Sequence, residues 1–285
     1  VYKRQTYTET ENDLTVKANK RTFIFSKKDG QLKGVSVDNR KINFANGPRF
    51  IGARRADRSL DQFYNHDDEK AKEKDRTYSE FPDAAVFTKL DVKEDGGNLV
   101  VTANYKLGNL DKAQWTINPS GDLALDYTYN FSGVVDLMGI RFDYPEDQVI
   151  SKRWLGAGPY RVWQNRIHGT QYDVWENDYN DPIPGETFTY PEFKGYFGDV
   201  SWMNIQTKEG TISLTNETPD TYIGVYQPRD GRDRLLYTLP ESGISVLNVI
   251  PPVRNKVNST DLCGPSSQPK WVNGPQTGRV IFRFM

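Results

Sequence analysis

Residues Trp154 to Arg166 read W-L-G-A-G-P-Y-R-V-W-Q-N-R, with two Trp, one Tyr and two Arg around Gly156, Gly158 and Pro159. Glycine permits positive φ and proline fixes φ, so we expect a tight turn that holds flat rings and guanidinium groups in one geometry. Such rings cover the C–H face of a sugar, and Arg donates hydrogen bonds to its hydroxyls. The stretch therefore predicts either a carbohydrate-binding turn or a buried turn with aromatic core on both sides.

The sequence around this stretch predicts β-strands separated by short turns. Residues 22–37 read as a hairpin around Lys28-Asp29-Gly30, and residues 99–105 follow the turn Asp95-Gly96-Gly97-Asn98. Further strands are expected at 85–92, 113–117, 123–129, 134–142, 199–205, 210–215, 222–226, 243–250 and 278–284, with 263–271 in a loop before the last one. We find no helical period and no fixed-period repeat, which favours an all-β sandwich over a propeller.

Composition narrows the classes of function. The chain has 285 residues and a net charge of −1, so it carries no electrostatic footprint for nucleic acid or an anionic membrane. No apolar run reaches the roughly 20 residues that span a bilayer. With Cys263 as the only cysteine and two His in all, we expect no internal disulfide, no metal site and no cofactor. A single unpaired cysteine fits the cytoplasm and also a bacterial periplasm. Between these, we favour a bacterial periplasmic or secreted location.

Four segments carry a family pattern in a fixed order. They are F-I-F-S-K-K-D-G-Q-L-K-G at 23–34, M-G-I-R-F at 138–142 followed by W-L-G-A-G-P at 154–159, P-E-F-K-G-Y-F-G-D-V-S-W at 191–202, and Cys263-Gly264 to Trp271 before a final strand. Together they resemble the C-terminal domain of family 2 glycoside hydrolases of the β-galactosidase type. The resemblance runs from about residue 21 to the end of the chain.

The sequence departs from that family at several positions. After G-P the family has an acidic residue, a Tyr and an Asp-Arg pair, whereas this chain has Arg161, Trp163 and Asn165-Arg166. The Gln-Glu pair after Pro191 is replaced by Glu192-Phe193. We therefore expect a distant relative whose preferred sugar need not be galactose.

The resemblance implies a fold and a role. The fold is the galactose-mutarotase-like super-sandwich of two large twisted antiparallel sheets, here over residues 21–285, with 1–20 as an edge strand or a linker from a preceding domain. In that family the two catalytic carboxylates lie on a separate (β/α)₈ barrel, and no βα repeats occur in this sequence. We therefore expect a non-catalytic domain that binds a galactoside or related glycan and completes the pocket of a barrel in the same polypeptide.

Six residues are candidates for substrate binding, and none is expected to be catalytic. The resemblance points to Trp271, which matches the family's pocket-lining Trp. The aromatic and guanidinium side chains in and after the central stretch add four candidates: Arg161, Trp163, Arg166 and Trp175. The sixth is His66, which lies on a charged segment, residues 60–79, that could reach over a site. The remaining Trp residues are expected in the core: Trp115, Trp154 and Trp202.

Two other functions remain open from the sequence. A stand-alone aldose epimerase of the mutarotase fold needs a general acid and a general base across the sugar ring, for which His66 or His168 with Glu176 or Glu192 are available. A free carbohydrate-binding module would instead show surface-exposed rings and would not depend on a barrel.

Overall fold

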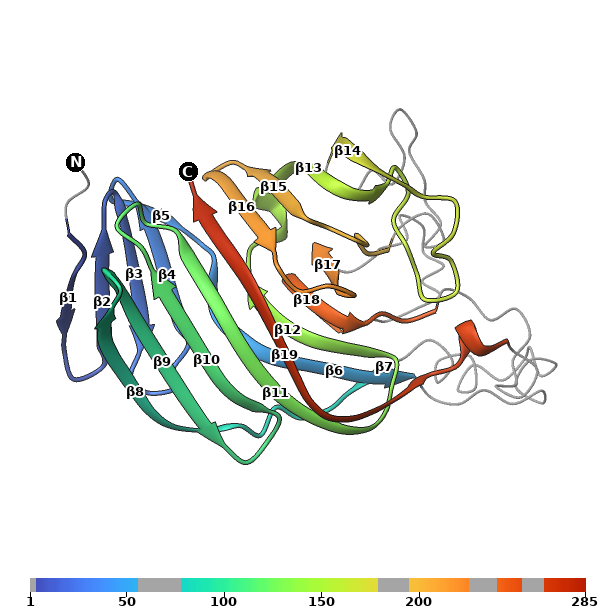
Figure 1. Ribbon diagram of the computed structural model, residues 1–285, viewed down its shortest axis with the longest axis horizontal. Coiled ribbons are helices and arrows are strands. Elements are labelled where there is room, and N and C mark those ends of the chain that lie inside the picture. The colour runs from blue at the N-terminus through green and yellow to red at the C-terminus, as the bar shows by residue number, and fades with distance from the viewer. Residues whose placement is uncertain (1–3, 56–77, 179–194, 226–239, 253–263) are drawn as a thin grey trace.

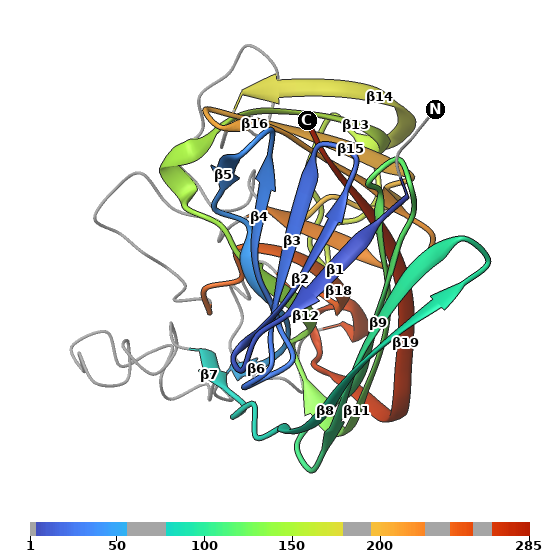
Figure 2. The ribbon, with the colours of Figure 1, turned by 90° about the vertical axis from the view of Figure 1, so that its left-hand side faces the viewer.

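The computed structural model describes residues 4–55, 78–178, 195–225, 240–252 and 264–285, which form mainly strands in two antiparallel sheets (Figure 1). In the view of Figure 2 the N-terminal strands of one sheet face the reader, beside the strands of the other. The predicted super-sandwich of two large sheets is confirmed. His66, Cys263 and residues 179–194 lie outside the described part of the chain.

Among the described residues, the first sheet has ten strands, in the order β1-β2-β3-β4-β6-β12-β18-β17, with β5 on β4 and β7 on β6. Their bounds are β1 Thr6–Glu9, β2 Asp13–Ala18, β3 Arg21–Ser26, β4 Leu32–Val37, β5 Arg40–Ile42, β6 Ala45–Arg55, β7 Tyr78–Glu80, β12 Leu137–Asp143, β17 Tyr222–Val225 and β18 Ile244–Val249.

The second sheet, over the same described ranges, has nine strands, in the order β14-β13-β15-β16-β19-β11-β10-β9-β8. Their bounds are β8 Val86–Asp95, β9 Asn98–Lys106, β10 Leu110–Ile117, β11 Leu123–Val135, β13 Val149–Gly158, β14 Gln171–Asp178, β15 Trp202–Thr207, β16 Gly210–Asn216 and β19 Lys270–Phe284. Two short 3-10 turns, η1 Glu146–Gln148 and η4 Pro265–Ser267, precede β13 and β19. No helix in the described ranges is long and apolar enough to cross a membrane.

The hairpins predicted from glycine-containing turns are present. Strands β3 and β4 pair across Gly30, whose φ is +75°. Strands β8 and β9 join with Asp95 opposite Asn98, and both intervening glycines have positive φ. Positive φ is the conformation that glycine adopts without a steric penalty, and this explains why the sequence located both turns correctly.

The main core lies between the two sheets, where alternate residues of each strand point inward. Phe44 stacks on Phe142 at a centroid distance of 4.7 Å. Trp115 and Trp154 are 0% exposed, as expected for core residues. Trp202, also expected in the core, is only half-buried, because it alternates with the fully buried Met203 and points to the opposite face of β15.

Residues 4–20 contribute strands β1 and β2 to the first sheet. Strand β1 lies at its edge, and β2 pairs with both β1 and β3. Leu14, Val16 and Ala18 of β2 are buried in the main core. The segment expected as an edge strand or a linker thus contributes apolar side chains to the same core as the later strands.

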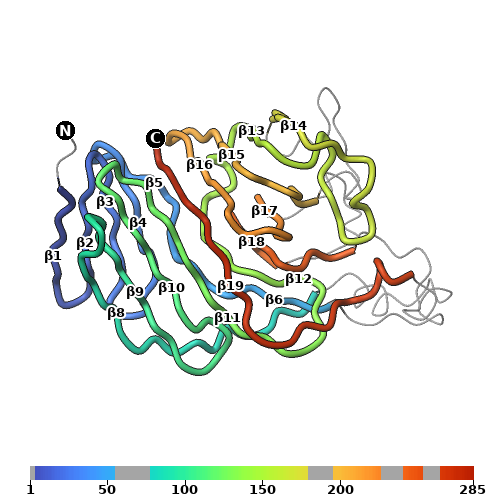
Figure 3. Tube along the Cα trace, in the orientation of Figure 1, coloured from blue at the N-terminus to red at the C-terminus, as the bar shows by residue number. Residues whose placement is uncertain are grey.

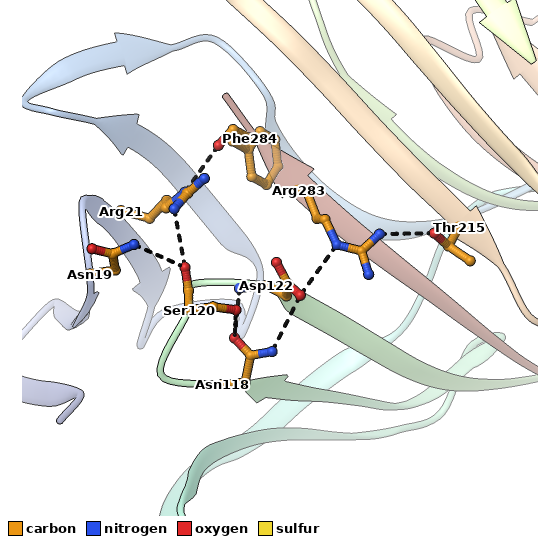
Figure 4. Close-up of polar contacts among 8 residues, drawn as sticks. All are labelled: Asn19, Arg21, Asn118, Ser120, Asp122, Thr215, Arg283 and Phe284. Atoms are coloured by element: carbon orange, nitrogen blue, oxygen red, sulfur yellow. Dashed lines mark hydrogen bonds and ion pairs between the residues drawn. The ribbon is translucent and has the colours of Figure 1, made fainter. Parts of the chain in front are cut away.

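A polar network joins the turns at one end of the two sheets (Figure 4). Arg21 of β3 donates from Nε to the Phe284 carbonyl at 3.0 Å and from Nη1 to the Ser120 carbonyl at 3.1 Å. Arg283 of β19 lies 3.2 Å from Asp122 and donates to Thr215 Oγ1 at 3.0 Å. These contacts fix the C-terminal strand against both the β2–β3 turn and the β10–β11 turn.

Strand β19 begins at Lys270, so the expected loop position of Trp271 is wrong. Its partner β11 is 13 residues long, and the two strands pair from Lys270 opposite Val135 to Phe282 opposite Leu123, as the long red and green strands of Figure 3 show. Gly274, Pro275 and Gly278 all lie within this β11–β19 ladder. At Gly278 an added Cβ would lie 2.2 Å from Tyr127 Oη, so a side chain would clash there.

Candidate functional site

The glycines of the central stretch serve close packing within a strand, and the tight turn predicted at Gly156 and Gly158 is wrong. Strand β13 continues through Gly158, and neither Gly156 nor Gly158 has positive φ. An added Cβ on Gly158 would lie 2.3 Å from Cδ1 of Trp175, and one on Gly156 would lie 3.0 Å from the carbonyl oxygen of Asp199. In the pattern W-x-G-x-G-P, the two glycines therefore let the Trp175 indole of β14 and the backbone of residues 198–200 pack directly against the backbone of β13.

The residues after Pro159 cover the outer face of the first sheet. A second core cluster forms there. Its members come from β6, β7, β12 and β18, from the residue that follows β18, and from the two covering segments around Val162 and Tyr196: Ile51, Ala53, Tyr78, Leu137, Val162, Trp163, Tyr196, Leu247 and Ile250. Val162 and Tyr196 exchange two backbone hydrogen bonds of 2.8 and 2.9 Å. This cluster fixes the turn at residues 161–166, called here the central turn, on the sheet.

Two of the predicted site residues are buried here: Trp163 belongs to this cluster, and Arg161 lies beside it. Trp163 is 1% exposed, and its ring meets Tyr196 edge-on at a centroid distance of 5.6 Å. Arg161 is 5% exposed, with its guanidinium carbon 5.2 Å from the centroid of the Phe197 ring. In this structure neither presents its side chain to solvent, because the sheet face and residues 195–197 enclose them.

The central turn also holds Arg166, whose side chain is exposed. Arg166 and Trp163 close the turn through backbone hydrogen bonds of 2.8 and 3.2 Å. Trp175 is half-buried on β14, where its Nε1 donates to the Gln171 carbonyl at 3.2 Å. The structure thus brings Arg161, Trp163 and Arg166 into one turn, whereas Trp175 packs against Gly158 at the end of β13, before the turn begins.

Trp271 differs from every other Trp of the chain. It is 72% exposed, whereas the other five are buried or half-buried. It lies on β19 directly opposite Val134 of β11. An exposed indole on a regular strand loses apolar contact with the core and leaves a broad ring face open, and Trp is enriched among the residues that dominate binding interfaces.

Hydrogen bonds connect the central turn to the segment that leads into Trp271. Gln164, itself 9% exposed, donates from Nε2 to the Gln268 carbonyl at 2.6 Å and from its backbone to the Pro251 carbonyl at 3.0 Å. Asn165 donates from Nδ2 to Ser267 Oγ at 3.3 Å. The sequence reasoning missed Gln164, since a single amide residue has no periodic or spacing signal.

A separate polar cleft of about 750 Å³ lies where β6 begins and β12 ends. Arg49 and Arg141 stand directly opposite each other on these strands, an unfavourable pairing unless it is neutralised. Arg49 pairs with Asp143, and Arg141 lies 3.5 Å from Glu80 and donates to the Glu241 carbonyl. The guanidinium groups are therefore compensated, and none of the described residues that line this cleft carries an exposed aromatic ring.

The acid–base pairs considered for an epimerase are only partly described. His66 and Glu192 lie outside the described residues, and His168 and Glu176 are exposed. Glu176 lies 3.9 Å from Arg153 on the neighbouring strand. Within the described ranges no group of three or more His, Cys, Asp or Glu could hold a metal ion.

Comparisons with known proteins identify a family. The family model described as Beta galactosidase small chain matches residues 17–251, which is most of the chain. No curated protein matches the sequence.

Several solved structures resemble the whole fold at low identity. Galactose 1-epimerase from Lactobacillus acidophilus NCFM is 10% identical over 99% of this chain and 98% of its own, with a TM-score of 0.48. A GalM/aldose epimerase homologue from C. elegans is 8% identical over 93% and 95%, with a TM-score of 0.39. A copper-containing benzylamine oxidase from Hansenula polymorpha is 6% identical over 98% and 60%, with a TM-score of 0.37. Likeness at these levels says nothing about activity.

Proposed function

Because the chain belongs to the β-galactosidase small-chain family, we propose that it is the non-catalytic C-terminal domain of a β-galactosidase-like glycoside hydrolase. In this role it binds carbohydrate and completes the active-site pocket of a separate catalytic barrel. The barrel supplies the two carboxylates that glycoside hydrolysis requires. The domain supplies an aromatic contact to the substrate.

The exposed ring of Trp271 carries this proposal. A ring that is 72% exposed on a strand is available to cover the C–H face of a pyranose. The lead-in segment is held by the bonds from Gln164 to Gln268 and from Asn165 to Ser267. A ring on a fixed strand loses little conformational entropy when a sugar binds, which favours recognition.

The test is one-dimensional proton NMR of galactose and other hexoses with the domain. We expect saturation transfer from protein to sugar without faster exchange between the anomers. Trp271→Ala should weaken binding about tenfold, which corresponds to the loss of roughly 1.4 kcal/mol. The matched control is Tyr7→Ala, which removes another exposed aromatic ring, on β1, and should leave sugar binding unchanged.

Two other results of this experiment would assign a different function to the domain. Accelerated exchange between the anomeric signals would overturn the non-catalytic role in favour of an aldose epimerase. Sugar binding by a chain whose reading frame encodes no barrel would identify a free carbohydrate-binding module. In a full-length enzyme with a barrel, Trp271→Ala should lower kcat/KM for the glycoside by a similar factor, and an unchanged kcat/KM would contradict a role in completing the pocket.

A further inference from the structure

We propose that Asn273 and Ser132 extend the face of Trp271 into a subsite for one neutral hexopyranose unit, in which the Asn273 amide donates to a hydroxyl of the stacked sugar. The inference rests on the proposed function and adds residues that neither the sequence pattern nor the family resemblance indicated. Here the four residues Trp271, Val134, Asn273 and Ser132 are called the β11–β19 platform.

The register of the two strands places these side chains on one face. Trp271 is opposite Val134, and Asn273 is opposite Ser132. Residues two apart on a strand point to the same side and are about 7 Å apart, so Asn273 follows Trp271 on the same surface. Asn273 and Ser132 are both exposed, as Trp271 is. A sugar stacked on the indole would therefore direct the hydroxyls of one edge toward Asn273.

Hydrogen bonds orient the Asn273 amide for donation. Ser132 Oγ donates to Asn273 Oδ1 at 2.8 Å and accepts from the Gly274 backbone N–H at 3.4 Å. With Oδ1 engaged by Ser132, the Nδ2 group points away from Ser132 and makes no hydrogen bond within the described part of the chain. Asn273 is thus the contacting residue, and Ser132 is a positioning residue that acts through it.

The chemistry of the platform selects the class of ligand. Its four side chains comprise an indole, an aliphatic group, an amide and a hydroxyl, and none is charged. The apolar pair suits the C–H face of a pyranose, and the polar pair suits its hydroxyl edge. A uronate or sulfated sugar would gain no cationic partner from these four residues. The platform therefore fits a neutral hexopyranoside.

The experiment is a titration of the ¹⁵N-labelled domain with methyl β-galactopyranoside and methyl β-glucopyranoside. The Asn273 side-chain NH₂ signal, identified by its absence in Asn273→Asp, should shift on titration. Asn273→Ala should raise Kd roughly three- to tenfold, the range of one hydrogen bond. Ser132→Ala should raise Kd by roughly two- to threefold, and Ser132→Thr should restore it. The control is Asn12→Ala, which changes an exposed amide between β1 and β2 of the other sheet and should leave Kd unchanged.

The outcomes separate this inference from the proposed function. If Trp271→Ala weakens binding while Asn273→Ala and Ser132→Ala do not, the platform is overturned and the Trp271 contact stands. If neither glycoside binds the wild-type domain, carbohydrate binding by the domain is overturned together with the platform. If methyl glucuronide binds more tightly than both neutral glycosides, the assigned ligand class is wrong.

Discussion

At the scale of single residues, the central stretch depends on glycines that leave room for a ring. Gly158 adjoins the indole of Trp175, which itself is anchored by its bond to the Gln171 carbonyl. Trp175 also packs against the main core. A side chain at Gly158 would have to displace a ring held from two sides, and cores that are overpacked in this way lose stability.

Gly158→Ala should therefore lower the free energy of unfolding by about 1–3 kcal/mol, because the new Cβ would lie 2.3 Å from the Trp175 ring. Urea denaturation followed by circular dichroism measures the change. The matched control is Gly34→Ala on β4, where an added Cβ meets nothing within 4 Å. Equal effects of the two substitutions would contradict the packing role of Gly158.

At the scale of elements, the β15–β16 hairpin is joined to the other sheet through Glu209. Its carboxylate accepts from the Asn43 backbone N–H at 3.0 Å, from the Asn43 side-chain amide and from the Tyr144 hydroxyl at 2.8 Å. Burial, with a contribution from Glu209, raises the pKa of Tyr144 well above its usual range. One acidic residue in a tight turn thus links the β5–β6 connection, the end of β12 and the hairpin.

Glu209→Gln should reduce the free energy of unfolding by about 1–3 kcal/mol, because an amide has one acceptor oxygen and directs its NH₂ group at existing donors. Thermal and urea unfolding both report the change. Glu9→Gln removes only the exposed ion pair with Lys27 and should cost less than about 1 kcal/mol. If Glu209→Gln proved as mild as this control, the hairpin would not depend on Glu209 for its attachment.

At the scale of the whole molecule, buried tyrosines tie stability to alkaline pH. Tyr127, Tyr129 and Tyr196 are at most 2% exposed, and burial raises the pKa of each hydroxyl well above its usual range. The unfolded chain releases these protons above about pH 10, whereas the folded chain retains them. Stability is therefore fully present below about pH 10 and is lost as the pH rises above it.

Each such tyrosine should remove roughly 1.4 kcal/mol of stability per pH unit above about pH 10. Urea midpoints from about pH 8 to about pH 11, with tyrosinate absorbance as a second signal, measure the loss. Tyr127→Phe should make the loss shallower and leave stability at neutral pH nearly unchanged, because among the described residues the buried Tyr127 hydroxyl has no hydrogen-bond partner. A slope that Tyr127→Phe leaves unchanged would contradict this assignment.

The sequence by itself determined the class of fold, the hairpins and the family. Alternating apolar residues and glycine turns, as at Gly30 and Gly96-Gly97, are local signals, since each depends on neighbours a few residues away. The order of four short motifs indicated a β-galactosidase-type domain, and the family match over residues 17–251 confirms it. Burial of Trp115 followed from the alternation of its own strand.

Only the tertiary structure decided which aromatic and cationic groups reach solvent. Trp163 and Trp271 are both Trp residues beside turn-forming sequence, yet one is 1% exposed and the other 72% exposed. The difference arises because residues 195–197 and the outer face of the first sheet enclose Trp163, whereas β11 offers Trp271 only Val134 as its directly opposite neighbour. Likewise, the pairing of Asn273 with Ser132 joins positions 141 residues apart. Enclosure and long-range register depend on segments distant in the chain, and local sequence patterns contain neither.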